Sequence, residues 1–158
     1  LWERDVQYVV LGSGEWQYES FFRELHDKYP DKVGVTIGFI PDLARKIYAG
    51  ADLFLMPSKS EPCGLSQMVA LRYGTVPIVR ETGGLKDSIT DSGDGEGNGF
   101  TFQTYDAYDM LGAIYRGVEA YNNKDYWPTL VERALNCDMS WGKSANEYIK
   151  MYKSLLKD

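Results

Sequence analysis

The sequence predicts an α/β fold in which helices sandwich a Rossmann-like parallel sheet, followed by a helical tail. Most of its short apolar runs lack strict alternation of apolar and polar residues, which is typical of strands covered on both faces. Helical patterns separate these runs, and strands that alternate with helices favour a parallel, doubly wound sheet. From Tyr105 onward the pattern is helical only. The expected strands cover 6–12, 33–38, 52–57, 76–79 and 99–102.

The first half of the chain carries three helical patterns, at 15–29, 41–49 and 64–73. Pro41 stands in the first turn of the second helix, where its missing N–H group costs no hydrogen bond. Gly74 is placed to end the third helix, because glycine readily takes the left-handed conformation that closes many helices. Each of these helices therefore connects two expected strands.

The tail is expected to form helices over 105–121, 126–136 and 141–156, with Ser140 as the cap of the last one. Its many aromatic residues could form a surface on which carbohydrate stacks. Several of them, however, recur with aliphatic residues at helical spacing, which favours packing in the core. The set on which this interpretation rests is Tyr108, Leu111, Tyr115 and Val118.

Length and composition are those of one globular domain, with 158 residues, 44% apolar and 25% charged. The net charge of −6 argues against a nucleic-acid partner, and no apolar run is long enough to span a membrane. Cys63, Cys137 and the single histidine, His26, cannot form a zinc site of the usual kind. The two cysteines are expected to be free thiols in a reducing cytoplasm. His26 is expected to lie on the surface. The acidic stretch 86–99 is interpreted as a solvated loop.

In a sheet of this type, ligands bind outside the carboxyl ends of the strands. Glycine-bearing or polar segments follow four of the expected strands. They are Gly12–Gly14, Gly38–Phe39, Ser58–Gly64 and Glu81–Gly84. The sequence therefore predicts a binding site at this edge, although Gly12–Gly14 alone fits an ordinary turn better than a dinucleotide fingerprint.

The strand-to-helix corner SEPCGLSQ, residues 60–67, is the most informative of these segments. If a helix starts near Gly64, the N–H groups of Gly64, Leu65 and Ser66 are free to bind phosphate at the positive end of the helix dipole. The absent Cβ of Gly64 would let a ligand approach. Glu61 suits hydroxyl groups, because a carboxylate accepts several hydrogen bonds. A phosphate site beside a site for hydroxyl groups would suit a sugar nucleotide. The alternative is a strand-to-helix connection that binds no ligand and in which Glu61 is merely solvated.

Three further features are compatible with a nucleotide site without requiring one. Phe39 could stack on a nucleobase, or fold back onto its own domain. The backbone amides of Thr82, Gly83 and Gly84 could approach a ligand, or form a plain turn. Arg80 could contact phosphate or take part in an ion pair.

The run EPCGLSQMVALRYGTVPIVRETGGLKDSI, residues 61–89, resembles bacterial glycogen synthases and plant starch synthases. The stretch IYAGADLFLMPSKSEPCGLSQ, the acidic loop before GFTF, and DMSW at 138–141 resemble the same family. The resemblance covers essentially the whole chain. It implies a retaining glucosyltransferase of the GT-B fold, of which this chain would be most of the C-terminal, donor-binding domain.

The resemblance also implies a reaction. Members of this family transfer glucose from ADP-glucose, or from UDP-glucose in some members, to the non-reducing end of an α-1,4-glucan. They need no metal or other cofactor, and they work in the cytoplasm, or in the plastid of a plant. Val69 stands eight residues after Glu61, where many other GT-B enzymes have a second glutamate. This departure fits glycogen and starch synthases better than sucrose synthases or mannosyltransferases.

Carried over by position, the resemblance makes Glu61 the catalytic residue, which holds donor hydroxyl groups close to the reacting carbon. The remaining roles concern the same donor. The backbone at Cys63 and Gly64 would touch the sugar, the N–H groups of Leu65 and Ser66 would hold the distal phosphate, Phe39 would stack on adenine, and Thr82, Gly83 and Gly84 would form a donor-site loop.

Compared with the family, residues 1–158 are expected to be a single truncated domain. The N-terminal GT-B domain and the first strand of the C-terminal domain would be absent, so the chain alone is expected to be inactive. That strand would lie between the runs at 6–12 and 52–57. The alternatives are another GT-B transferase that uses a UDP-sugar, and a glucan-binding module without catalysis.

Overall fold

The computed structural model describes residues 4–156. The chain forms two compact units, residues 1–50 and 51–158. In both units strands alternate with helices and all paired strands are parallel. The predicted α/β fold with helices beside parallel sheets is therefore confirmed.

The first unit consists of β1 (Tyr8–Gly12), α1 (Trp16–Lys28), β2 (Val33–Ile37) and α2 (Pro41–Gly50). β1 and β2 pair in parallel, with Tyr8 opposite Val33, and α1 packs on β2. Pro41 begins α2 as predicted. His26 is not a surface residue, because it is half-buried with its Nδ1 atom 2.6 Å from the carbonyl oxygen of Val33. It therefore anchors α1 to β2.

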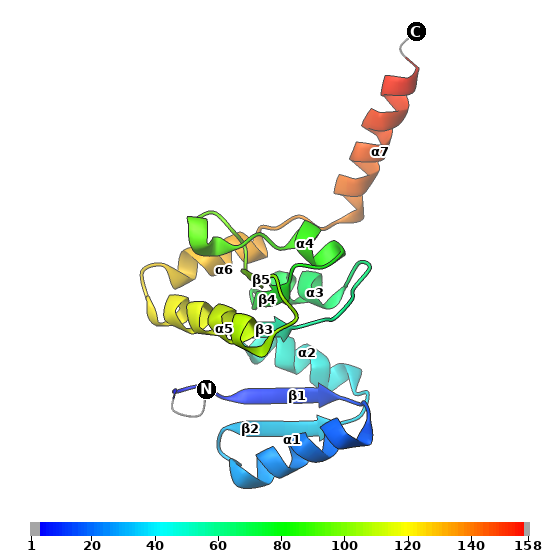
Figure 1. The fold of residues 1–158 in the computed structure, drawn as a ribbon. Helices are drawn as coiled ribbons and strands as arrows, with labels where there is room; N and C mark the ends of the chain where they lie inside the picture. Colours follow the sequence, from blue (N-terminus) through cyan, green and yellow to red (C-terminus); the bar gives the residue numbers. More distant parts are fainter. Residues whose placement is uncertain (1–3, 157–158) are drawn as a thin grey trace. The chain divides into compact units, whose positions relative to one another are not determined.

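The second unit is built on a three-stranded parallel sheet in the order β3 (Leu53–Met56), β4 (Val76–Arg80) and β5 (Phe100–Phe102). α3 (Ser66–Tyr73) connects β3 to β4, and α4 (Gly84–Ser88) and the 3-10 helix η1 (Ser92–Asp94) follow β4. The chain ends with α5 (Ala107–Asn122), α6 (Trp127–Leu135) and α7 (Trp141–Leu155). Figure 1 shows α5 along one side of this sheet and α3 with α4 along the other.

Alternation along β4 gives this sheet a core on both faces. Val76 and Ile78 pack in one cluster with Ala113 of α5, whereas Val79 packs in a second cluster with Leu71 of α3. β4 is buried over its whole length except at Arg80. A central strand covered on both faces needs apolar residues at consecutive positions, which is the pattern that the sequence shows.

The prediction for the aromatic tail is only partly right. Val118 is buried and Tyr115 is half-buried, but the side chain of Tyr108 is 83% exposed. Tyr108 lies in the first turn of α5, whose N–H groups the side chain of Asp106 caps. β5, the neighbouring strand, has only three residues, so little sheet lies under this turn.

The acidic stretch is not a solvated loop throughout. Asp91 accepts hydrogen bonds from the N–H groups of Gly93 and Thr101, at 2.8 and 2.7 Å, and from Arg116 Nη1 at 2.6 Å. Burial alone would raise the pKa of Asp91, but Arg116 and these N–H groups outweigh it and hold the pKa below its usual value. Asp91 therefore holds the segment before β5 against α5.

α7 lacks a buried face. Ser140 caps it as predicted, accepting a hydrogen bond from the N–H group of Lys143 at 3.4 Å, and Gly74 closes α3 with a φ of 77°. Yet no residue of α7 is buried, and Tyr148, Met151 and Tyr152 expose about half of their side-chain surface each.

The strands form two separate sheets within residues 4–156. β1 pairs with β2 only, and β3 with β4 only, in this part of the chain. The family resemblance expects one more strand between β1 and β3. That expectation stays a prediction.

Candidate functional site

Glu61 lies in the segment between β3 and α3 and is half-buried. Within residues 4–156 its carboxylate forms neither a hydrogen bond nor an ion pair. A half-buried carboxylate can accept several hydrogen bonds, so Glu61 has unused capacity for hydroxyl groups. The role of Glu61 toward the sugar of a donor stays a prediction.

The N-terminus of α3 carries free backbone donors. α3 begins at Ser66, two residues later than predicted, and Leu65 precedes it without a side-chain cap. In the described part of the chain, no acceptor takes the N–H groups of Gly64, Leu65 and Ser66. Leu65 is also 70% exposed, so this end of the helix is accessible. Free N–H groups at the positive end of a helix dipole are suited to an anion.

The structure gives Gly64 a structural reason to be glycine that the sequence did not indicate. The residue is buried and its φ is 76°, a conformation that favours glycine. A Cβ atom at this position would lie 2.6 Å from Oε1 of Gln67. The missing side chain therefore makes room for Gln67, and the approach of a ligand to Gly64 stays a prediction.

The structure brings the loop Thr82–Gly84 against the corner. The N–H group of Gly84 donates to the carbonyl oxygen of Pro62 at 3.2 Å. A Cβ atom on Gly83 would lie 1.9 Å from the carbonyl oxygen of Glu61, and one on Gly84 would lie 2.2 Å from that of Cys63. The two glycines thus serve a close contact between backbones, which a plain turn would not need.

Arg80 forms no ion pair in the described chain, and its guanidinium group donates to backbone carbonyl oxygens instead. Its Nε atom donates to the carbonyl oxygen of Ser58 at 2.9 Å, and its Nη atoms donate to those of Lys59 and Gln103, at 2.5 and 3.2 Å. The ion-pair alternative for Arg80 is therefore wrong, and its contact with phosphate stays a prediction. The guanidinium group ties together the segments that follow β3 and β5.

Phe39 lies in the first unit, in the segment between β2 and α2, and the residue is 91% exposed. It is not folded back onto its own unit, which contradicts the alternative interpretation. Gly14 in the same unit donates its N–H group to the carboxylate of Glu19 at 3.0 Å, as expected for an ordinary turn. Stacking of Phe39 on a nucleobase stays a prediction.

Gln67 is the residue at this corner that the sequence reasoning did not select. It is 1% exposed, and its Nε2 atom donates to the carbonyl oxygens of Cys63 and Gly64, at 3.3 and 2.9 Å, and to Ser88 Oγ at 3.1 Å. One signal was available, because Gln67 shares the buried side of α3 with Ala70 and Leu71. A polar residue at a core position of a helical pattern needs hydrogen-bond partners.

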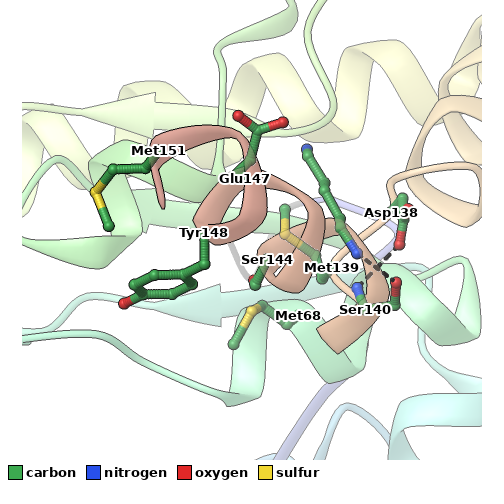
Figure 2. Close-up of a pocket in the computed structure, with 9 residues that line it drawn as sticks. Met68, Asp138, Met139, Ser140, Ser144, Glu147, Tyr148 and Met151 are labelled. Carbon is green, nitrogen blue, oxygen red and sulfur yellow. Dashed lines mark hydrogen bonds between the residues drawn. The ribbon is translucent and has the colours of Figure 1, made fainter. Parts of the chain in front are cut away.

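A separate open pocket of about 590 Å³ lies between α3, the segment 138–140 and α7. Figure 2 shows Met68 of α3 facing Tyr148 and Met151 of α7 across it, with Met139 beside them. It includes none of the predicted site residues. The pocket is therefore distinct from the corner, although Met68 comes directly after the corner in the sequence.

Both cysteines are free thiols as predicted, Cys63 exposed and Cys137 half-buried. The described residues contain no group of three or more His, Cys, Asp or Glu side chains that could hold a metal ion. No helix in this part of the chain is both long and apolar enough to cross a membrane.

Comparison with known proteins agrees with the resemblance. The chain is 54% identical to glycogen synthases of Bacillus cereus and Geobacillus thermodenitrificans, over 99% of its own length and 33% of theirs. Among solved structures it matches the catalytic domain of starch synthase IV from Arabidopsis thaliana bound to ADP and acarbose. That match has a TM-score of 0.83 and 39% identity, and it covers 94% of this chain and 32% of the other.

A sucrose-phosphate synthase from Thermosynechococcus elongatus has the same fold, with a TM-score of 0.64 and 22% identity over 95% of this chain. The chain spans about a third of the length of the curated relatives that it matches. The family described as Glycosyl transferases group 1 matches residues 1–127. A match over most of the length, together with the parallel sheets and their flanking helices, shows that the chain belongs to the glycosyl transferases group 1 family.

Proposed function

We propose that this chain is the donor-binding part of a glycogen or starch synthase. The whole enzyme would transfer glucose from ADP-glucose to the non-reducing end of an α-1,4-glucan, with retention at the reacting carbon. The observation that carries the proposal is the pairing of an unused, half-buried carboxylate at Glu61 with free N–H groups at the start of α3. The carboxylate accepts hydrogen bonds from sugar hydroxyls, and the N–H groups bind phosphate.

The relatives support this choice of substrates. Glycogen synthases are 54% identical to the chain, and the similar starch synthase structure holds ADP and acarbose, an adenine nucleotide with a glucan-like ligand. In the proposed complex the N–H groups of Leu65 and Ser66 hold the distal phosphate, and the backbone at Cys63 and Gly64 contacts the glucose. Phe39 stacks on adenine, and Thr82–Gly84 completes the donor site.

The reaction follows from the same groups. As the bond between glucose and phosphate breaks, negative charge grows on the leaving diphosphate, and the N–H groups with the α3 dipole stabilise it. Glu61 holds the glucosyl hydroxyls and stabilises positive charge at the reacting carbon. The leaving phosphate accepts the proton of the attacking glucan hydroxyl, which arrives on the same face. No metal ion or other cofactor takes part in this proposal.

The rest of the enzyme would supply the acceptor surface. The exposed side chains of α7 and the pocket beneath it, lined by Met68 and Met139, are proposed to contact an N-terminal GT-B domain. Because this chain spans about a third of its relatives, we expect it to bind the donor but not to transfer glucose alone. The cytoplasm, or the plastid of a plant, is the proposed location.

A chimera tests this function. Residues 1–158 would replace the matching third of the Bacillus cereus glycogen synthase, and glucose incorporation into maltoheptaose would be measured with ADP-glucose and UDP-glucose. We expect a chimera active with ADP-glucose. Glu61→Gln should lower kcat by about 100-fold or more, whereas Glu119→Gln, an exposed carboxylate on α5, should leave it unchanged.

Each other outcome points to an alternative. A preference for UDP-glucose would favour the alternative that the chain belongs to another GT-B transferase, one that uses a UDP-sugar. A folded chimera that is inactive with both donors, while the chain itself binds maltoheptaose and no nucleotide, would identify a glucan-binding module. Full activity of the Glu61→Gln chimera would exclude the role proposed for Glu61.

A further inference from the structure

Gln67 is buried directly beneath the corner. Its Nε2 atom faces three oxygen atoms, the carbonyls of Cys63 and Gly64 and the hydroxyl of Ser88. These acceptors fix the orientation of the amide, because the reversed amide would place its oxygen against three others. The Oε1 atom then faces Gly64 and has no hydrogen-bond partner in the described structure.

These contacts determine where two N–H groups point. In a trans peptide the C=O group of one residue and the N–H group of the next point in opposite directions, and no peptide bond in the described chain is cis. Gln67 draws the C=O groups of Cys63 and Gly64 toward the interior. The N–H groups of Gly64 and Leu65 are therefore turned away from Gln67, toward the outside of the corner.

The third donor, the N–H group of Ser66, is held by the helix itself. The C=O group of Leu65 accepts from the N–H group of Val69 at 3.0 Å, as the first hydrogen bond of α3. This bond sets the peptide between Leu65 and Ser66, so the N–H group of Ser66 depends on the helix and not on Gln67. The corner thus contains two kinds of donor, which differ in what holds them.

We propose that Gln67 is a positioning residue that aims the N–H groups of Gly64 and Leu65 at the diphosphate and sugar of the donor. This inference rests on the proposed function, since it assumes that these N–H groups bind the donor. Ser88 adds a connection to α4, because its hydroxyl accepts from Gln67 and donates to the carbonyl oxygen of Gly84 at 2.6 Å. The amide therefore also links the corner to the Thr82–Gly84 loop.

The test uses inorganic pyrophosphate and the 158-residue chain labelled with ¹⁵N. Without glucose attached, pyrophosphate can also reach the N–H group of Gly64, so in the wild type it should shift the amide protons of Gly64, Leu65 and Ser66 downfield, as hydrogen bonds to a charged oxygen form. Gln67→Met keeps the size of the side chain but removes the donors. We expect about tenfold weaker binding or more, with the downfield shifts of Gly64 and Leu65 lost and that of Ser66 kept.

A matched variant separates positioning from loss of stability. Thr75→Val removes a buried donor to the carbonyl oxygen of Ala51 beyond the other end of α3, a contact of 3.1 Å. It should lower stability without changing the pyrophosphate shifts. If Gln67→Met does not fold, the pH dependence of pyrophosphate binding by Gln67→Glu tests the same proposal. Its carboxyl group can donate only when protonated, so its binding relative to wild type should recover on acidification from about pH 8 to pH 5.

The outcomes separate the two proposals. If wild type binds pyrophosphate and Gln67→Met shows the same affinity and the same three shifts, Gln67 does not position the donors, and the proposed function stands. Equal loss of all three shifts in a folded Gln67→Met would also overturn the inference. If wild type shows no shift at the corner, the phosphate site itself is wrong, and both proposals fall.

Discussion

Gly84→Ala probes the contact between the Thr82–Gly84 loop and the corner. The added Cβ atom would lie 2.2 Å from the carbonyl oxygen of Cys63 and 2.7 Å from its Cα atom. Both neighbours are backbone atoms, and both are well inside the ordinary contact distance of about 3.5 Å. Gly84 is also the first residue of α4 and does not have a positive φ. The cost of the substitution is therefore steric.

The magnitude follows from two opposing terms. Forcing a methyl group into a packed site costs about 1–3 kcal/mol, and contact with backbone on two sides favours the upper part of that range. Replacing glycine by alanine where the backbone allows it stabilises by about 0.4–1 kcal/mol. We expect a net loss of about 1–2 kcal/mol in the free energy of unfolding.

Urea unfolding monitored by fluorescence, with the thermal midpoint as a second measure, would determine this loss. About 1–2 kcal/mol corresponds to a fall of roughly 4–10 °C in Tm for a unit of this size. Gly112→Ala is the control, because nothing lies within 4 Å of the added Cβ on α5, and it should be neutral or stabilising. Wild-type stability of Gly84→Ala, with unchanged amide shifts at Cys63 and Gly64, would refute the contact.

Two more predictions concern titration and thiol access. Because the folded pKa of Asp91 is lowered, its carboxylate stabilises the fold above the unfolded pKa of about 3.9, and this contribution is lost as the pH falls through the folded pKa. Wild type should therefore lose stability on acidification from about pH 5 to pH 3 more steeply than Asp91→Asn, and equal slopes in urea unfolding would contradict the network. Iodoacetamide should alkylate the exposed Cys63 faster than the half-buried Cys137, and ADP-glucose should slow only the reaction at Cys63. Mass spectrometry of both sites measures the rates, and protection of neither thiol would argue against a donor beside Cys63.

The fold was predictable to within a few residues because its signals are local. Continuous apolar runs mark strands covered on both faces, and Pro41, Gly74 and Ser140 mark helix ends through their own backbone chemistry. α4 was missed because it has only five residues, Gly84–Ser88, too few to show a helical period.

The candidate site was predictable in part, for a related reason. The types of residue at Glu61 and at the start of α3 follow from the chemistry of one short segment. The roles of Gln67, Arg80 and Asp91 depend instead on partners ten or more residues away, at Ser88, Ser58 and Thr101. A single sequence gives residue types and spacing but not such pairs, so these structural roles could not be assigned from it.

The glycines of this site allow the backbone groups of the corner to be held in fixed positions. Gly64 makes room for the amide of Gln67, and Gly83 and Gly84 let one loop lie directly on the carbonyl oxygens of Glu61 and Cys63. The proposed phosphate donors are backbone N–H groups, which cannot turn without moving the chain that carries them. Stabilising the charge of a leaving diphosphate with such donors requires that they be held before the reaction begins. In the proposed function, closely packed glycines and the buried amide of Gln67 meet that requirement at this corner, and the carboxylate of Glu61 remains available for the sugar.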